Sequence, residues 1–213
     1  MSLYLVNEDE LELEAGRLCL EFCNTVDWHA SDHPINYLNS YADLVAWARK
    51  VKMLDAEAEE GLLKEAGKNP QEAARVLEKG VTLRETIYRV FTSLAHHRHP
   101  SEEDLTLLNG FIVEMLSKTV IAAQNGSFRW AWAGEEKSLE SVLWPIVLSA
   151  ADLLTDHDPE RIKQCADDRG CGWLFYDITR NNSRQWCSMS SCGNRAKAKR
   201  HYEKVKIQLS KLS

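Results

Sequence analysis

The C-terminal part of the chain carries four cysteines whose spacing restricts its fold more than any other feature of the sequence. They form a C-x5-C pair and a C-x4-C pair with fifteen residues between the pairs: Cys165, Cys171, Cys187 and Cys192. Each pair is close enough along the chain to place two thiolates on one small tetrahedral centre, and zinc is the usual occupant of a four-sulfur site. Four thiolates leave no open coordination position, so we expect one structural Zn²⁺ ion that activates no water.

Disulfide bonds are the alternative role for these cysteines, and the rest of the sequence argues against them. The first ten residues turn acidic without the basic start of a secretory signal. No apolar run approaches the roughly 18 residues of a membrane span. We therefore expect a cytoplasmic protein without a membrane segment, and clustered cysteines in that reducing compartment are more often metal ligands.

The net charge of −6 hides a division of charge along the chain. Residues 1–158 carry 14 Lys and Arg against 27 Asp and Glu, whereas residues 159–213 carry 12 against 5. The two segments therefore have net charges of −13 and +7. A helical pattern also stops near Thr155 and a proline follows at Pro159, so we expect two units, 1–158 and 159–213. An acidic body with a basic module favours nucleic-acid binding by the module, although small metal modules are also often mildly basic for solubility.

The N-terminal unit has a mainly helical pattern with one β element. Apolar side chains repeat at helical spacing in residues 16–26, 41–48, 70–100 and 101–115. Ser40 with Asp43 and Ser101 with Asp104 are capping signals for two of these helices. Residues 119–122 and 127–132, on either side of Asn125-Gly126, predict a β-hairpin. A last helix is expected over residues 138–154, with Pro145 kinking or restarting it. The fold class is thus mostly α with a minor β-hairpin, an α+β domain.

The order of elements in the C-terminal unit is typical of a treble-clef zinc finger. Gly170 suits the positive φ of a knuckle turn between the first two cysteines. Strand formers follow at 173–178, a polar turn at 180–184, and residues 185–187 return toward the metal. A helix then begins at Cys192. Its apolar positions are spaced by four and three residues: Ala198, Tyr202, Val205, Leu209 and Leu212.

These residues resemble a known family, the CGNR zinc fingers. The resemblance rests on Cys165, Cys171, the run from Phe175 to Met189, and Cys192-Gly193-Asn194-Arg195. It implies that the finger follows an N-terminal ABATE domain, a ligand-binding-like region whose opening motif residues 18–26 resemble. It also implies a role in stress-induced transcription regulation. The five residues between Cys165 and Cys171 are a departure in detail that leaves zinc binding intact.

The last helix and the preceding turn provide the candidate nucleic-acid contacts. Cationic side chains cover much of the helix beside its apolar stripe and suit phosphate oxygens. The candidate contacts are Arg180, Arg184, Asn194, Arg195, Lys197, Lys199, Arg200 and Lys204. Two alternatives stay open: Asn194 and Arg195 could instead hold the loops of the finger, and the lysines could form a solvated face.

Two further sets of residues lie in the N-terminal unit. Asn24 and Thr25 beside an apolar helix face, with Arg84 from the long helix, are candidate ligand-binding residues, or they satisfy buried backbone groups. Cys19 and Cys23, with His29 and His33 just beyond, suggest a second metal site, but cysteines on an apolar stripe are usually core residues.

The favoured hypothesis is a DNA-binding transcription regulator with an N-terminal sensor for a small molecule or a stress. Because a single finger reads only a few base pairs, a homodimer would help specificity. The alternative is a protein-interaction adaptor whose finger docks a partner or covers its own acidic N-terminal unit. The sequence has no defensible catalytic triad, phosphate loop or catalytic carboxylate pair, so we do not expect an enzyme.

Overall fold

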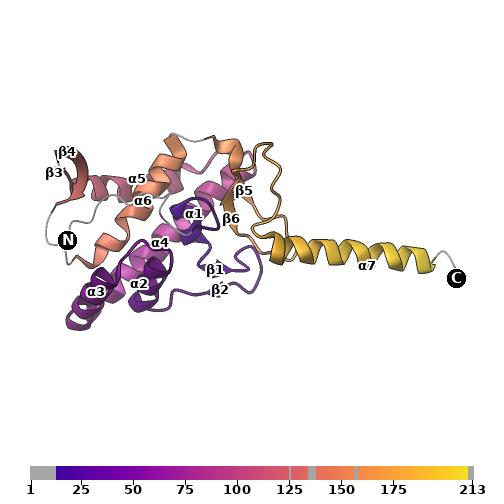
Figure 1. Ribbon diagram of the computed structural model, residues 1–213, viewed down its shortest axis with the longest axis horizontal. Helices are drawn as coiled ribbons and strands as arrows, with labels where there is room; N and C mark the ends of the chain where they lie inside the picture. The colour runs from indigo at the N-terminus through magenta and orange to yellow at the C-terminus, as the bar shows by residue number, and fades with distance from the viewer. Residues whose placement is uncertain (1–12, 125, 134–137, 156–157, 211–213) are drawn as a thin grey trace.

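The computed structural model describes residues 13–124, 126–133, 138–155 and 158–210 of the chain (Figure 1). We refer to residues 13–155 as the N-terminal region and to residues 158–210 as the C-terminal module. The described helices of the N-terminal region are α1 (Leu18–Cys23), α2 (Tyr41–Lys50), α3 (Ala56–Lys68), α4 (Pro70–Ala95), α5 (Glu102–Ser117) and α6 (Trp144–Thr155). The predicted helices are therefore present, and α3 is an addition that the sequence pattern did not reveal.

Capping residues set several of the helix boundaries. Ser40 and Asp43 form a complete capping box at the start of α2, and Ser101 accepts a hydrogen bond from the Asp104 N–H at the start of α5. Pro145 lies in the first turn of α6, where a missing N–H does no harm, so this proline restarts the helix after the short 3₁₀ helix η2 (Leu139–Val142).

Helix α1 is shorter than the expected 16–26 helix because the chain leaves it to form a small sheet. Strand β1 (Val26–Asp27) pairs antiparallel with β2 (Ile35–Asn36), which places Val26 opposite Asn36. The predicted hairpin is also present, as β3 (Thr119–Gln124) and β4 (Ser127–Trp132), with Ile121 opposite Trp130. Gly126 takes a positive φ of 78° in the connection, and Asn125 lies outside the described residues.

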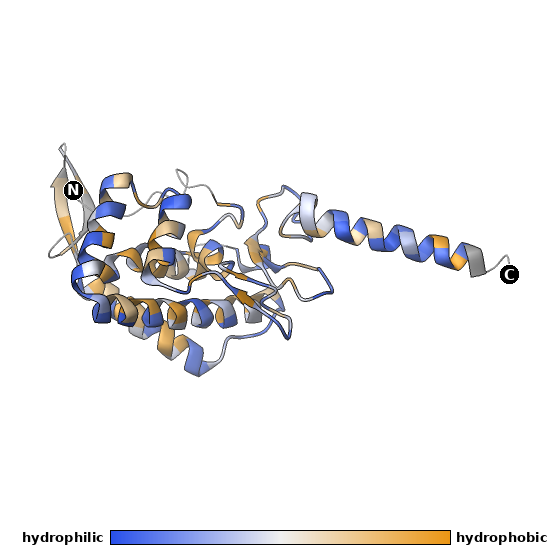
Figure 2. Cartoon of the chain, turned by 90° about the horizontal axis from the view of Figure 1, so that it is seen from below, coloured by the Kyte–Doolittle hydropathy of each residue, from blue (hydrophilic) through white to orange (hydrophobic). Residues whose placement is uncertain are grey.

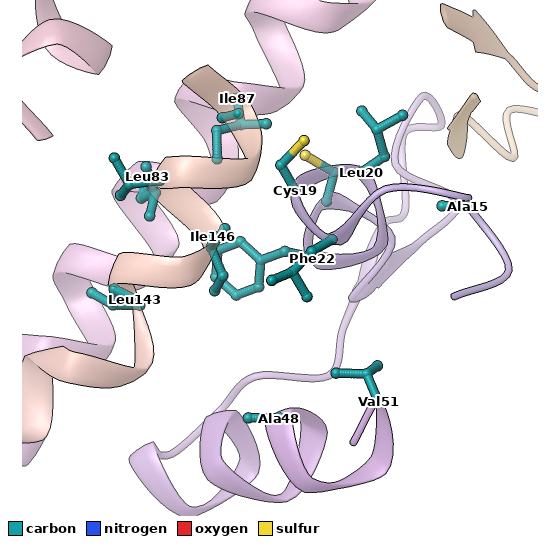
Figure 3. Packing of buried hydrophobic residues seen from close by; sticks show 14 of the residues in the cluster. Ala15, Cys19, Leu20, Phe22, Ala48, Val51, Leu83, Ile87, Leu143 and Ile146 are labelled. Atoms are coloured by element: carbon teal, nitrogen blue, oxygen red, sulfur yellow. The ribbon is translucent and has the colours of Figure 1, made fainter. Parts of the chain in front are cut away.

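The core of the N-terminal region is built around α1 (Figure 3). Phe22 of α1, Leu83 and Ile87 of α4, and Ile146 of α6 are almost completely buried. Cys19 and Cys23 are fully buried beside them, in keeping with the role of cysteine as a small core residue. Burial of one face of each helix in this way is the main stabilising term for a domain of this kind.

The C-terminal module contains two short strands and one long helix. Its elements are η3 (Pro159–Arg161), β5 (Ile162–Gln164), β6 (Leu174–Tyr176), a π-helical turn η4 (Met189–Gly193) and α7 (Asn194–Ser210). Strand β6 was predicted, but its partner is β5, which precedes the knuckle, with Ile162 opposite Tyr176. Residues 185–187 return toward the cysteines without forming a strand and contribute one backbone bond, from the Ala166 N–H to the Gln185 carbonyl oxygen.

Helix α7 projects away from the rest of the molecule (Figures 1 and 2). Residues 197–208 are all exposed, and hydrophilic residues dominate the helix surface (Figure 2). The expected apolar stripe is therefore unburied at Ala198, Tyr202 and Val205. Leu212 and the side chain of Leu209 lie outside the described part of the chain.

The fold-class prediction is confirmed: the N-terminal region is mainly helical with small antiparallel sheets, and the C-terminal module has the cysteine cluster of a zinc finger. In the described part of the chain, no helix combines the length and apolar character needed to cross a membrane.

Candidate zinc centre and nucleic-acid interface

The four cysteines come from four different places in the C-terminal module. Cys165 follows β5, Cys171 lies in the knuckle, Cys187 ends the loop after β6, and Cys192 lies in the π-helical turn η4. All four side chains are buried, with 2% to 8% exposure. Gly170 takes the predicted positive φ, 91°, which turns the knuckle between the first two cysteines.

The distances between the sulfur atoms fit one tetrahedral metal ion. All four Sγ atoms lie within 4.8 Å of one another. The Sγ of Cys187 is 3.7 Å from that of Cys171 and 3.5 Å from that of Cys192. A zinc ion with Zn–S bonds of about 2.3 Å requires sulfur–sulfur distances of about 3.8 Å. The residues present therefore suit one structural zinc, and this is the one group among the described residues in which three or more potential ligand side chains come together.

Without a metal, four sulfurs this close together cannot all ionise. A hydrogen bond between the thiols of Cys165 and Cys171 lowers the pKa of Cys165, and its contact with Cys187 lowers it further. The same contact with Cys165 raises the pKa of Cys187 far above its usual range. A dication removes this conflict because it stabilises every thiolate at once. The chemistry of the four sulfurs thus favours a bound divalent ion.

Arg195 supports the cysteine cluster from outside. Its Nη2 lies 2.8 Å from the Sγ of Cys192, and the same nitrogen donates to Asp167 Oδ2 at 2.9 Å. Nε donates to this carboxylate oxygen as well, at 3.1 Å, and the guanidinium lies 5.3 Å from the centre of the Trp28 ring. Since four thiolates around Zn²⁺ leave a net negative charge, a cation at this distance stabilises the metal-bound state. Arg195 therefore joins α7, the knuckle and the sulfurs.

A buried aspartate organises the turn between β6 and Cys187. Asp177 is fully buried and accepts hydrogen bonds from Lys163 Nζ at 2.8 Å, Thr179 Oγ1 at 2.6 Å and the Arg184 N–H at 2.8 Å. Burial works to raise the pKa of Asp177, but these donors outweigh it and lower that pKa well below the ordinary value. The 177–184 turn is thereby fixed against β5.

The knuckle lies directly against the N-terminal region. The Cys171 carbonyl oxygen accepts a hydrogen bond from the His29 N–H at 3.1 Å. Gly172 has a φ of 72°, and a Cβ there would lie 2.6 Å from the Ala30 backbone nitrogen and 2.9 Å from the Tyr88 hydroxyl. Only glycine allows this close approach. The cysteine cluster is consequently packed on the loop that follows β1.

Asn24 and Trp173 connect the two parts of the chain next to β6. The Asn24 side chain donates to the Leu174 carbonyl oxygen at 2.9 Å and accepts from the Leu174 N–H at 3.0 Å, as a neighbouring strand would. Trp173 Nε1 donates to the Val26 carbonyl oxygen at 3.0 Å. The candidate ligand-binding residue Asn24 therefore has a structural role between the two parts.

The other two candidate ligand-binding residues contact each other. Arg84 is 3% exposed, and its Nη1 donates to Thr25 Oγ1 at 3.2 Å and to Asn36 Oδ1 at 2.7 Å. Its Nε also donates to Glu85 Oε1 at 3.0 Å. Asn24 and Thr25, but not Arg84, line a cleft of about 740 Å³ that lies between α1, α2 and Trp173.

The structure divides the candidate nucleic-acid contacts into two groups. Arg184, Asn194 and Arg195 bond within the chain: Arg184 donates to the carbonyl oxygens of Trp186 and Cys187, and Asn194 donates to that of Ser190. The remaining candidates are exposed at the module surface: Arg180, Lys197, Lys199, Arg200 and Lys204. Within this second group, Lys199 pairs with Asp168, and Arg200 lies 5.6 Å from the centre of the Trp186 ring.

Sequence reasoning missed the residues that hold the module together. Asp167 forms a salt bridge with Arg195, and Asp177 forms one with Lys163. The sequence pattern assigns these aspartates only to the knuckle and to a strand. The Asp167–Arg195 pair could have been suspected, because Asp167 lies between two metal ligands and an arginine follows the last ligand by three residues. No comparable signal pointed to Trp28, since its contact with Arg195 joins residues that are far apart in the sequence.

Comparisons with known proteins agree with this geometry. One family model, described as "Putative stress-induced transcription regulator" and named ABATE, matches residues 16–157. A second, the CGNR zinc finger, matches residues 161–205. No curated protein matches the chain. The first match spans most of the N-terminal region and the second includes all four cysteines, so the chain belongs to the ABATE family and carries a CGNR zinc finger at its C-terminal side.

Proposed function

We propose that this protein is a transcription regulator that binds duplex DNA through the exposed cations of α7 and the adjacent 180–184 turn. The observation that carries the proposal is the projection of α7 from a metal-centred module, with Lys197, Arg200 and Lys204 exposed on it (Figure 1). Such cations neutralise phosphates and release condensed counterions, which is the main source of sequence-independent affinity for DNA.

The charge distribution supports the same function. The N-terminal unit, 1–158, is acidic and repels DNA, whereas residues 159–213 have a net charge of +7. The acidic body therefore favours an orientation in which only the module approaches the duplex. The N-terminal unit is the sensor in this proposal, and the family description of its residues 16–157 supports a role in transcription regulation.

The test is a titration of duplex DNA with the zinc-loaded full chain at several salt concentrations. We expect the logarithm of affinity to fall linearly with the logarithm of salt concentration. Replacing Lys197, Arg200 and Lys204 with glutamate should weaken binding and reduce the salt slope by roughly 2 to 3, because about one counterion is released for each phosphate contact.

A matched control makes the same change of charge elsewhere. Lys64, Arg98 and Lys118 are exposed on the N-terminal region, and their replacement with glutamate should leave the salt slope unchanged. Equal loss of affinity in both triple variants would show a general charge effect and contradict contact through α7.

The second candidate function is docking of a protein partner on the same helix. It is favoured by the exposed apolar side chains Tyr202, Val205 and Ile207, which are 69%, 37% and 55% exposed. A chain that binds no duplex DNA at low salt, while its zinc content is complete, would favour this adaptor role over the regulator. The same titration therefore separates the two functions.

A single finger contacts only a few base pairs, so recognition of a longer DNA sequence requires more than one finger. We propose that two copies of the chain bind one site. The stoichiometry of the complex, measured by analytical ultracentrifugation with a duplex of defined length, tests this. One chain per specific duplex would contradict it.

A further inference from the structure

The cleft beside α1 and α2 has the features of a small-molecule site. Its volume of about 740 Å³ falls within the range of roughly 300 to 1,000 Å³ that is usual for ligand pockets. It lies between the N-terminal region, which contributes α1 and α2, and the C-terminal module, which contributes Trp173. Ligand sites occur often at such junctions.

The charges that line the cleft are mainly negative. Glu14, Glu21 and Asp43 provide three carboxyl groups, against one ammonium group from Lys50. Asp43 is partly engaged, since its Oδ2 accepts from the Ser40 N–H in the capping box. Glu21 accepts from the Ala15 N–H at 2.7 Å through Oε2. Because a carboxylate can accept about four hydrogen bonds, the Glu21 side chain retains capacity for a cationic donor in the cleft.

Aromatic and aliphatic side chains form the rest of the wall. Trp47 and Trp173 both line the cleft, together with Leu38 and Val51. Trp47 packs against Phe22 of the core, with 5.1 Å between the ring centres, and Trp173 is held by its hydrogen bond to Val26. Both indoles are thus fixed in position, and indole faces attract organic cations as well as apolar groups.

We propose that this cleft binds an amphipathic organic cation, with an ammonium group near Glu21 and an aromatic or short aliphatic body between the indole side chains. An anionic ligand would meet three carboxyl groups and is disfavoured. A ligand in the cleft touches Asn24 and Trp173, the residues that connect the N-terminal region to β6. This inference rests on the sensor role proposed above and names the class of molecule that is sensed.

The experiment compares three probes that share one phenylethyl body. Phenethylammonium carries the cation, 3-phenylpropionate carries a carboxylate, and 2-phenylethanol is neutral. Each is titrated into the zinc-loaded full chain by calorimetry, without DNA, so the result does not depend on whether the finger binds DNA. We expect the ammonium probe to bind at least about 10-fold more tightly than the carboxylate probe, because the cleft presents three carboxyl groups against one ammonium group. A tenfold difference in affinity corresponds to about 1.4 kcal/mol.

Two charge variants test the position of the cation. Glu21→Gln keeps an acceptor for the Ala15 N–H and removes the charge, so it should weaken ammonium binding by roughly 5-fold or more. Lys50→Gln removes the repelling ammonium of the protein and should strengthen binding. Glu102→Gln, at an exposed position of α5 outside the cleft, is the matched control and should change nothing.

Three results would overturn the proposal. One is equal or tighter binding of the carboxylate probe, and another is ammonium binding that neither Glu21→Gln nor Lys50→Gln alters. The third is no binding of the ammonium probe at millimolar concentration to a chain that carries its full zinc content.

Discussion

The N-terminal region and the C-terminal module share one apolar cluster but differ in what else stabilises them. Phe22, Leu83 and Ile146 belong to a continuous apolar core that several helices share (Figure 3). In the C-terminal module, Ile162, Leu174 and Phe175 of the short sheet are buried in the same apolar cluster. Beyond that sheet, the module relies on four buried cysteines and on buried polar groups such as Asp177. A module of this size buries too little apolar surface to be stable alone, so packing on the N-terminal region and a metal ion together supply much of its stability. A substitution in one part should therefore affect zinc binding and the free energy of unfolding differently from a substitution in the other.

The largest expected effect is loss of the metal. Cys171→Ser removes one of four sulfurs, and structural zinc contributes about 10 to 16 kcal/mol of apparent binding free energy in zinc-finger peptides. We expect most of the zinc affinity to be lost and the module to lose its fixed structure. Zinc content by mass spectrometry, with Cys19→Ala in the core as the control that keeps one zinc per chain, measures this. Zinc affinity equal to that of the unaltered chain would contradict the assignment of Cys171 as a ligand.

The second effect concerns the apolar core. Phe22→Ala should lower the free energy of unfolding by about 3 to 5 kcal/mol, because it leaves a cavity beside α4 and α6. The folded variant should still hold one zinc, since the Phe22 ring packs against Trp47 of α2 and near Gly80 of α4 (Figure 3). Chemical denaturation followed by zinc analysis tests both statements. Loss of zinc from the folded variant would show that the two parts are not separately stabilised.

A smaller effect is expected for the polar interior of the module. Asp177→Asn removes a buried charge that faces Lys163 and two backbone N–H groups, at a cost of about 2 to 3 kcal/mol. Because the pKa of Asp177 is lowered in the folded chain, its contribution is complete above the unfolded carboxyl pKa of about 4 and is lost as pH falls toward the lowered value. The difference in stability between variant and unaltered chain should therefore be the same at pH 6 and pH 8. A difference that shrinks between these values would contradict the hydrogen-bonded carboxylate.

The smallest effect concerns the connection between the two parts. Asn24→Ala leaves the N–H and carbonyl of Leu174 without their side-chain partner, which should cost about 1 to 2 kcal/mol. The unfolding transition of the N-terminal region should then respond less to zinc removal than in the unaltered chain. A thermal melt with and without chelator measures this response. An unchanged response would mean that Asn24 does not couple the two parts.

Local signals in the sequence predicted most of the helices and the metal ligands. The Ser40 and Ser101 caps and the four cysteines act over a few residues, so their spacing was sufficient. The periodicity of α7 also predicted a helix, but periodicity does not reveal a partner, and the apolar positions Tyr202 and Val205 are exposed.

Contacts between distant segments could not be predicted in the same way. Strand β5 has only three residues and pairs with β6 across the knuckle. The polar turn at 180–184 instead favoured a hairpin between β6 and residues 185–187. The bond between Asn24 and Leu174 spans 150 positions, and no pattern in one sequence indicates it. The same holds for the approach of Gly172 to Ala30, which depends on how the module packs on the N-terminal region.

Hydrogen exchange of the full chain, with and without a zinc chelator, tests most directly whether one metal ion stabilises the C-terminal module alone. We expect amides of β5, β6 and the first turn of α7 to lose protection when zinc is removed, while those of α4 and α6 retain it. Protection of β5 and β6 that survives complete removal of zinc, or equal loss in α4, would contradict a module held together by its metal.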